Sequence, residues 1–326
     1  MNPNEIRFQT GSILEEEIPK LAEFIVEIRE GSVLAPPYMT KEKIRKQLRK
    51  SVESEEYTQI IARDDHGHVM GFMSIFTGFE SMAFISSWNP IVVVNENETS
   101  IAIRLVEKAK ELAVKRNIDR LEVVFPDITK DHRKVLAKFI DVYTHAGFRL
   151  ASEEIKMELN LELNPPDVPE IPQEVKICKL SDISNDEIKE CFDGSFKNSR
   201  DRLFLSMNEE QQEISFNYWF NRERDFNEQA SLLILRDMSV IGYSIVRPDD
   251  DVMSIGPFGI IPSEQRKGLG KLLLSLSLRE LHKQGISHLK VEVDKDNITA
   301  RKIYEKVGFK ETTSQIYYYW RSVSDF

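Results

Sequence analysis

The sequence predicts a mixed α/β protein built from two tandem copies of one domain, each a mostly antiparallel mixed sheet flanked by helices. Its 326 residues suit two domains better than one. A proline-rich segment lies near the middle, and matching landmarks occur in the same order on either side of it. We therefore expect a first domain over residues 1–163, a linker over 164–174 and a second domain over 175–326.

The composition is that of a folded protein and argues against several classes of partner. The chain is 41% hydrophobic and 30% charged, which is enough apolar sequence for a core. Its net charge of −10 argues against nucleic acid as a direct partner, because phosphate binding needs a basic face. No apolar run approaches twenty residues, so we expect no membrane span and a cytoplasmic protein. The two cysteines and six histidines have no metal-ligand spacing, so no metal is expected.

The linker and the repeat follow from particular stretches of sequence. The segment "LNPPDVPEIPQE" (163–174) holds four prolines and suits an extended, semi-rigid connector. "IIARDDHGHVMGFMSIF" from Ile60 and "LILRDMSVIGYSIV" from Leu233 each read as a β-hairpin. Later, "YTHAGF" in the first half matches "YEKVGF" in the second. The first copy is about ten residues longer between these landmarks, and we expect the extra residues around 125–134.

The second half gives the order of elements most clearly. Apolar alternation predicts a hairpin over 231–237 and 240–247, and three further strands over 253–261, 288–293 and 313–320. Leucine spacing predicts a helix over 271–285, and a second helix is expected over 298–307. Asn297 suits the N-cap of that second helix, and Gly308 suits its C′ position. The order β-β-β-α-β-α-β indicates a layered α/β domain.

A glycine loop precedes the leucine-rich helix. Residues 265–270 read "QRKGLG", and the helix follows directly. The first N–H groups of a helix lack partners and carry partial positive charge, and glycine lets them approach an anion. Arg266, Lys267 and Lys271 add cations, so the loop suits a pyrophosphate. A plain solvated turn is the alternative, because neither a Walker loop nor a dinucleotide fingerprint is present.

Two motif blocks in this half resemble the GNAT superfamily of acyl-CoA-dependent N-acyltransferases. The family's loop pattern, [Q/R]-x-x-G-x-[G/A], is met at Gln265, Gly268 and Gly270. Its next block is met at Asn297, Ala300, Tyr304, Gly308 and Phe309. The resemblance spans about 176–326. The first half resembles the same family by its topology and by Tyr143 and Gly147-Phe148.

The resemblance implies a cosubstrate and the residues that would bind it. The loop N–H groups would hold the pyrophosphate of acetyl-CoA, and the strand over 256–261 would splay from its neighbour to admit the pantetheine arm. The implied cofactor-binding residues are Phe258, Gly259, Ile260, Gln265, Arg266, Lys267, Gly268, Leu269, Gly270, Lys271, Asn297 and Tyr304.

The implied reaction is attack of a neutral amine on a thioester, and it assigns two catalytic residues. Tyr304 would protonate the leaving thiolate; a core tyrosine is the alternative. Glu292 lies on the opposite strand face from Val291 and Val293, and beside the gap its pKa could be raised for a role as base. The spacing of Glu292, Asn297 and Tyr304 is that of the ribosomal-protein alanine N-acetyltransferase branch. A solvated structural glutamate is the alternative.

The first copy departs from the family at the loop. Where the glycines should lie it has "NENETS" (95–100), and Glu96 and Glu98 would repel a phosphate. We expect a degenerate domain that keeps the scaffold and has lost cofactor binding.

The sequence thus predicts an acetyl-CoA-dependent N-acetyltransferase with its chemistry in the second domain. The acceptor would be a small-molecule or peptide amine, approached by acceptor loops within 181–228 that we expect to be helical and polar. The chain would be a monomer or a homodimer. Two alternatives stay open: a mycothiol-synthase-like enzyme that acetylates a small amino-sugar thiol precursor, and a non-catalytic acyl-CoA-binding protein.

Overall fold

The computed structural model describes residues 6–11, 13–30, 40–163, 166–249 and 252–322. The chain divides into two compact units: residues 1–151 with 315–326 form unit 1, and residues 152–314 form unit 2. Residues 164 and 165 of the expected linker lie outside the described residues. Within the described part of the chain, no helix is long and apolar enough to cross a membrane.

The units differ from the expected domains because of strand pairing. β7 (Arg149–Asn160) begins in unit 1, but from Glu154 onward it pairs antiparallel with β12 (His288–Asp294) of unit 2. β13 (Lys310–Arg321) lies next to β6 (Arg120–Ile128) in the sheet order, and its Tyr318 packs in the core of unit 1. Residues 152–163 therefore fold with unit 2, and residues 315–322 fold with unit 1.

The sheet of unit 2 has the strand order β8-β9-β10-β11-β12-β7. Its strands are β8 (Lys176–Lys179), β9 (Leu232–Arg236), β10 (Ser239–Asp249) and β11 (Val252–Ile260), followed by β12 and β7. All neighbours in it are antiparallel except β11 and β12, which run parallel. The predicted hairpin and later strands of this half are confirmed. β8 was not predicted, because four residues are too few to show a period.

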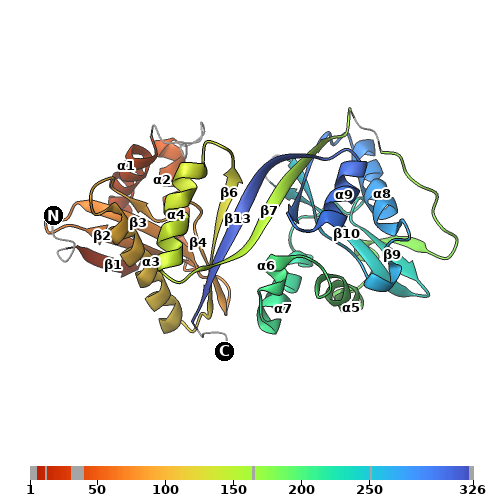
Figure 1. Cartoon of the computed structure of the whole chain (residues 1–326), viewed down its shortest axis with the longest axis horizontal. Coiled ribbons are helices and arrows are strands. Elements are labelled where there is room, and N and C mark those ends of the chain that lie inside the picture. The colour runs from red at the N-terminus through yellow and green to blue at the C-terminus, as the bar shows by residue number, and fades with distance from the viewer. Residues whose placement is uncertain (1–5, 12, 31–39, 164–165, 250–251, 323–326) are drawn as a thin grey trace. The chain divides into compact units, whose positions relative to one another are not determined.

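Helices cover both faces of this sheet (Figure 1). α8 (Leu269–Lys283) packs on one face of β9, β10 and β11, and its leucines are buried as predicted. α9 (Ile298–Lys306) shares a core cluster with α8 and β12. α5 (Asn185–Phe196) packs on the other face of β10 and β11, followed by the helices α6 (Arg202–Leu205) and α7 (Glu209–Trp219). Asn297 caps α9, and Gly308 has a φ of 102°, as expected.

The segment expected to be polar acceptor loops contains an aromatic core. Rings from α5, α6, α7 and the residue after α7 form one cluster with Tyr243 of β10; they belong to Phe192, Phe196, Phe204, Phe216, Trp219 and Phe220. These aromatic residues fix the three helices against the sheet. The buried positions of α5, including Ile188, Phe192 and Phe196, have helical spacing, so the sequence held a signal for this apolar face that the expectation of polar loops did not use.

Unit 1, like unit 2, is a mostly antiparallel sheet flanked by helices. Its sheet runs β1-β2-β3-β4-β6-β13, with β5 (Ile91–Val92) paired to β3. The first strands are β1 (Arg7–Gly11), β2 (Tyr57–Arg63), β3 (Val69–Phe76) and β4 (Met82–Ile85). The helices α1 (Ile18–Arg29) and α2 (Lys41–Glu53) form one core cluster with Ile61 and Phe72, whereas α3 (Glu98–Lys115) and α4 (Arg133–His145) belong to another.

Most of the extra length of the first copy lies around 125–134, as expected. β6 has nine residues where β12 has seven, and α4 has 13 where α9 has 9. Both α4 and α9 end two residues after the repeated tyrosine, so the extra residues of α4 lie at its start. The rest of the difference is in α3, which has 18 residues where α8 has 15.

Candidate active site

Two parallel strands of unit 2 separate soon after they pair. β11 and β12 are in register only at Met253–Leu289 and Ser254–Lys290, although both strands continue for several residues. On its other side β11 stays paired with β10, with a register shift between Ser244 and Val246. Gly256 is exposed here, and a Cβ added to it would have no heavy atom within 4 Å. The splay expected for this strand is therefore present and leaves open space beside Gly256.

Beyond the splay, β11 presents different residues to its two faces. Phe258 and Ile260 pack in clusters with α8. Gly259 faces the α5 side, where an added Cβ would lie 2.5 Å from the Tyr243 hydroxyl and 2.8 Å from Ser195 Oγ. These two hydroxyls hydrogen-bond each other at 2.6 Å, so a glycine is required where they approach β11.

The glycine loop enters α8 with an open N-terminus. Gly268 is the N-cap with a φ of 84°, and Arg266 also has a positive φ of 62°. Among the described residues no side chain caps this helix. Gln265 turns back to donate from Nε2 to the Ile260 carbonyl at 2.9 Å, which ties the loop to the end of β11. The N–H groups of the first turn are therefore available to an anion.

The charges around the loop are more mixed than the sequence suggested. Lys267 is 3.1 Å from a carboxylate oxygen of Glu264, and Glu264 also pairs with Arg236 at 2.8 Å. Lys271 lies 3.7 Å from Asp167. The loop thus offers main-chain N–H groups to an anion, while Lys267 and Lys271 already have carboxylate partners.

Tyr304 lies under the splayed strand. Its side chain is 4% exposed, and its ring centroid is 6.0 Å from that of Phe258 and 5.8 Å from that of Phe309. Burial raises the pKa of Tyr304, so its phenol stays protonated at neutral pH. Gly270 of α8 is close by, since an added Cβ would be 3.3 Å from Ile303 and 3.7 Å from Phe258. The structure thus brings the loop, β11 and Tyr304 together.

Glu292 and Asn297 follow on β12 and at the start of α9. Val291 and Val293 are buried in the cluster that contains Tyr304, whereas Glu292 is exposed on the opposite face. The predicted alternation of this strand is confirmed. The side-chain oxygen of Asn297 accepts from the Ala300 N–H at 3.2 Å, so its observed contact is a helix cap.

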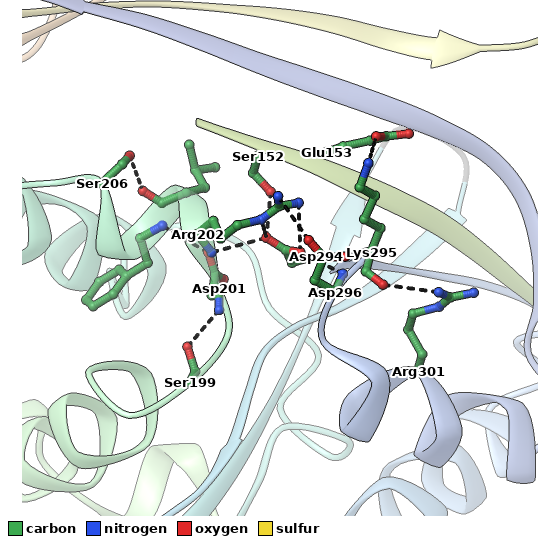
Figure 2. Close-up of polar contacts among 12 residues, drawn as sticks. Ser152, Glu153, Ser199, Asp201, Arg202, Ser206, Asp294, Lys295, Asp296 and Arg301 are labelled. Atoms are coloured by element: carbon green, nitrogen blue, oxygen red, sulfur yellow. Dashed lines mark hydrogen bonds and ion pairs between the residues drawn. The ribbon is translucent and has the colours of Figure 1, made fainter. Parts of the chain in front are cut away.

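A polar cluster that the sequence did not reveal lies at the end of β12 (Figure 2). The Asp294 carboxylate, 3% exposed, binds the Arg202 guanidinium and main chain and the Ser152 hydroxyl. Asp201 caps α6 by accepting from the Phe204 N–H at 2.9 Å. Burial and the nearby Asp294 charge raise the pKa of Asp201 to about 6. No motif signals this cluster, because Arg202 and Asp294 are 92 positions apart.

The described residues of unit 1 do not repeat this arrangement. Asn97 is the N-cap of α3, and Glu98 occupies its first turn and pairs with Lys138 at 3.5 Å. Trp88 packs against Phe125, with ring centroids 5.3 Å apart, beside the strand that corresponds to β12. The helix N-terminus that would face a phosphate thus carries the Glu98 carboxylate.

Comparison with known proteins agrees with this arrangement. Residues 194–309 match the acetyltransferase (GNAT) family. The [ribosomal protein bS18]-alanine N-acetyltransferase of Haemophilus influenzae is 34% identical over 27% of this chain and 60% of its own length. The mycothiol acetyltransferase of Streptomyces avermitilis is 32% identical over 28% of this chain and 31% of its own. The chain thus matches less than two thirds of either relative.

Solved structures with the same fold cover both halves of the chain. A GCN5-related N-acetyltransferase from Sphaerobacter thermophilus superposes with a TM-score of 0.65 at 15% identity, over 98% of both chains. A tandem GNAT protein from the clavulanic acid biosynthesis pathway gives 0.57 at 15% identity, over 99% of this chain and 100% of its own. The predicted fold class is confirmed by these likenesses. The chain carries, over residues 194–309, a domain of the acetyltransferase (GNAT) family.

Proposed function

We propose that unit 2 transfers an acetyl group from acetyl-CoA to a primary amine. The observation that carries the proposal is one juxtaposition: the uncapped N-terminus of α8 opens beside splayed β11, and Tyr304 packs against Phe258 of the same strand. Oriented N–H groups suit the pyrophosphate, and an open strand edge suits the amide-containing pantetheine arm.

The residues present fit this cosubstrate. The main chain from Gln265 to Lys271 would hold the pyrophosphate, with Arg266, Lys267 and Lys271 at its rim. The main chain of Phe258, Gly259 and Ile260 would pair with the pantetheine. Asn297 is retained as a binding residue on the family resemblance, although its side-chain oxygen caps α9.

The two proposed catalytic residues lie on opposite faces of the sheet. Tyr304 belongs to the α8 and α9 face, and Glu292 to the other. An alkyl ammonium with a pKa of about 10.4 must lose a proton before it attacks, and Glu292 would accept that proton directly or through water. The protonated Tyr304 phenol would donate to the departing thiolate. Proton removal and proton delivery would thus occur on different sides of the reacting carbonyl.

The acceptor is a small-molecule or peptide amine. This class is supported by the activities for which the two relatives are named, one on a ribosomal-protein alanine and the other in mycothiol acetylation. We assign the chemistry to unit 2 alone, because Glu98 occupies the corresponding helix start in unit 1.

The test uses the full chain, with calorimetry for acetyl-CoA and CoA and a thiol-release assay with a panel of amines. Gly268→Ala and Gly285→Ala form a matched pair: both glycines have positive φ, 84° and 75°, and neither has an atom within 4 Å of an added Cβ. Both variants should lose about 1 kcal/mol of stability. Only Gly268→Ala should weaken acetyl-CoA binding, by at least about tenfold.

Two results would count against the proposal. Binding of CoA without turnover of any amine would favour a non-catalytic acyl-CoA-binding protein. Equal acetyl-CoA affinities in the two glycine variants would show that the loop before α8 is not the pyrophosphate site.

A further inference from the structure

The residues on either side of the α5–α6 connection contact the two strands of the splay. At the end of α5, Ser195 hydrogen-bonds Tyr243, and both hydroxyls lie against Gly259 of β11. Seven residues later, the Arg202 main-chain N–H and guanidinium bind Asp294 of β12 at 2.9–3.1 Å. This short segment thus reaches from one strand to the other where they no longer pair.

The contact at β12 is an ion pair between the buried Asp294 carboxylate and the partly exposed Arg202 guanidinium. Burial by itself raises the pKa of Asp294, but hydrogen bonds from Arg202, the Asp296 N–H and Ser152 bring it below its ordinary value. Arg202 is also 3.0 Å from Asp296 (Figure 2). Removing one partner of such a pair leaves a buried charge unsatisfied, so the segment should shift when the pair is broken.

The segment from Ser195 to Arg202 lies on one face of the sheet of unit 2, and the glycine loop before α8 lies on the opposite face. Tyr304 and the α8 loop belong to one face of the sheet, whereas Glu292 and Asp294 alternate onto the other. Under the proposed function, the amine would approach from the face of Glu292, because the α8 face is taken by the phosphate loop. The α5–α6 connection then forms a wall of the acceptor approach.

We propose that Arg202 is a positioning residue whose ion pair with Asp294 holds the α5–α6 connection across the splay and so sets the affinity for the amine. The inference rests on the proposed function. It assigns no contact between Arg202 and the reacting atoms, and it concerns the acceptor rather than acetyl-CoA.

The chain offers a matched control in Arg222. Its guanidinium donates to Asn185 Oδ1 and to the carbonyls of Leu180 and Ile183 at 2.6–2.9 Å, so it also fastens helical segments of unit 2. None of these partners belongs to β11 or β12. Loss of Arg222 should therefore lower stability without moving the α5–α6 connection.

The experiment compares Arg202→Gln, Arg202→Lys and Arg222→Gln in the full chain. Initial rates are measured with the best amine of the panel and with acetyl-CoA, each varied in turn. Arg202→Gln should raise the KM of the amine at least about tenfold and leave the KM of acetyl-CoA within about twofold. Arg202→Lys should recover part of this loss, and Arg222→Gln should lower Tm alone.

Hydrogen exchange of the unliganded protein gives a second readout. Amides of residues 196–206 should exchange faster in Arg202→Gln, whereas those of 265–271 should not change. Unchanged exchange in 196–206, or an equal rise in both KM values, would overturn the inference while the proposed function stands. Absence of acetyl-CoA binding and turnover in the unaltered protein would overturn the proposed function, and the acceptor role of Arg202 with it.

Discussion

The Tyr143 hydroxyl donates a hydrogen bond to the main-chain carbonyl of Asn89 at 2.8 Å. Tyr143 is the first-copy counterpart of Tyr304 in the repeated Y-x-x-x-G-F block, and it is completely buried. Tyr304 lies against Phe258, and in the part of the chain that is described its hydroxyl has no hydrogen-bond partner. The same landmark thus has its hydroxyl engaged in unit 1 and free for another partner in unit 2.

Replacing each tyrosine by phenylalanine should separate structure from catalysis. Tyr304→Phe removes the proposed proton donor, so kcat should fall about 10²-fold or more while acetyl-CoA affinity stays within a few fold. Tyr143→Phe removes one buried hydrogen bond, so stability should fall by about 1 kcal/mol while kcat stays unchanged. Steady-state rates, calorimetry and thermal unfolding of both variants provide the comparison. Equal kcat values for Tyr304→Phe and the unaltered protein would mean that Tyr304 is a core residue and does not donate the proton.

Two glycines of β11 should respond differently to alanine. In Gly259→Ala the new Cβ would overlap Tyr243 and Ser195, so stability should fall by about 1–3 kcal/mol. In Gly256→Ala the Cβ enters open space, so stability should change little. Thermal unfolding measures both. A Gly259→Ala variant as stable as Gly256→Ala would show that Tyr243 does not lie against this strand.

Asp201→Asn should stabilise the protein near neutral pH. The folded pKa of Asp201, about 6, lies above the ordinary 3.8, so its ionisation destabilises the folded state above pH 6. Asparagine keeps the helix cap and removes the charge near Asp294. The gain should reach up to about 3 kcal/mol at pH 8, shrink as the pH falls from 6, and vanish below about 4.

The measurement is Tm at pH 4.5 and at pH 8. Asp186→Asn, at an exposed carboxylate in the first turn of α5, serves as the control and should change Tm little at either pH. A lower Tm for Asp201→Asn at pH 8 would mean that its carboxylate makes a favourable interaction there.

The cysteines should react slowly with thiol reagents in the folded protein. Burial raises the pKa of Cys178 to about 11 and that of Cys191 to about 12, so little thiolate exists at pH 8. Cys191 is also only 2% exposed. Titration with a disulfide reagent should therefore label Cys178 slowly and Cys191 only after denaturant is added. Rapid labelling of both thiols in the native protein would contradict their burial.

The sequence by itself determined the features that depend on neighbouring residues. The alternation in β12 placed Glu292 opposite Val291 and Val293, and the Asn297 cap and Gly308 bounded α9. The glycines before α8 marked its open N-terminus, and the repeated landmarks indicated two copies. These features are readable because strand period, capping and positive φ are set within a few residues of the chain.

Only the tertiary structure decided the pairings between distant segments. It placed most of β7 beside β12 in unit 2 and most of β13 in unit 1. It revealed why position 259 must be glycine and joined Arg202 to Asp294 across 92 positions. Such contacts depend on which surfaces meet after the sheet forms, and the local periodicity of the sequence does not specify those surfaces.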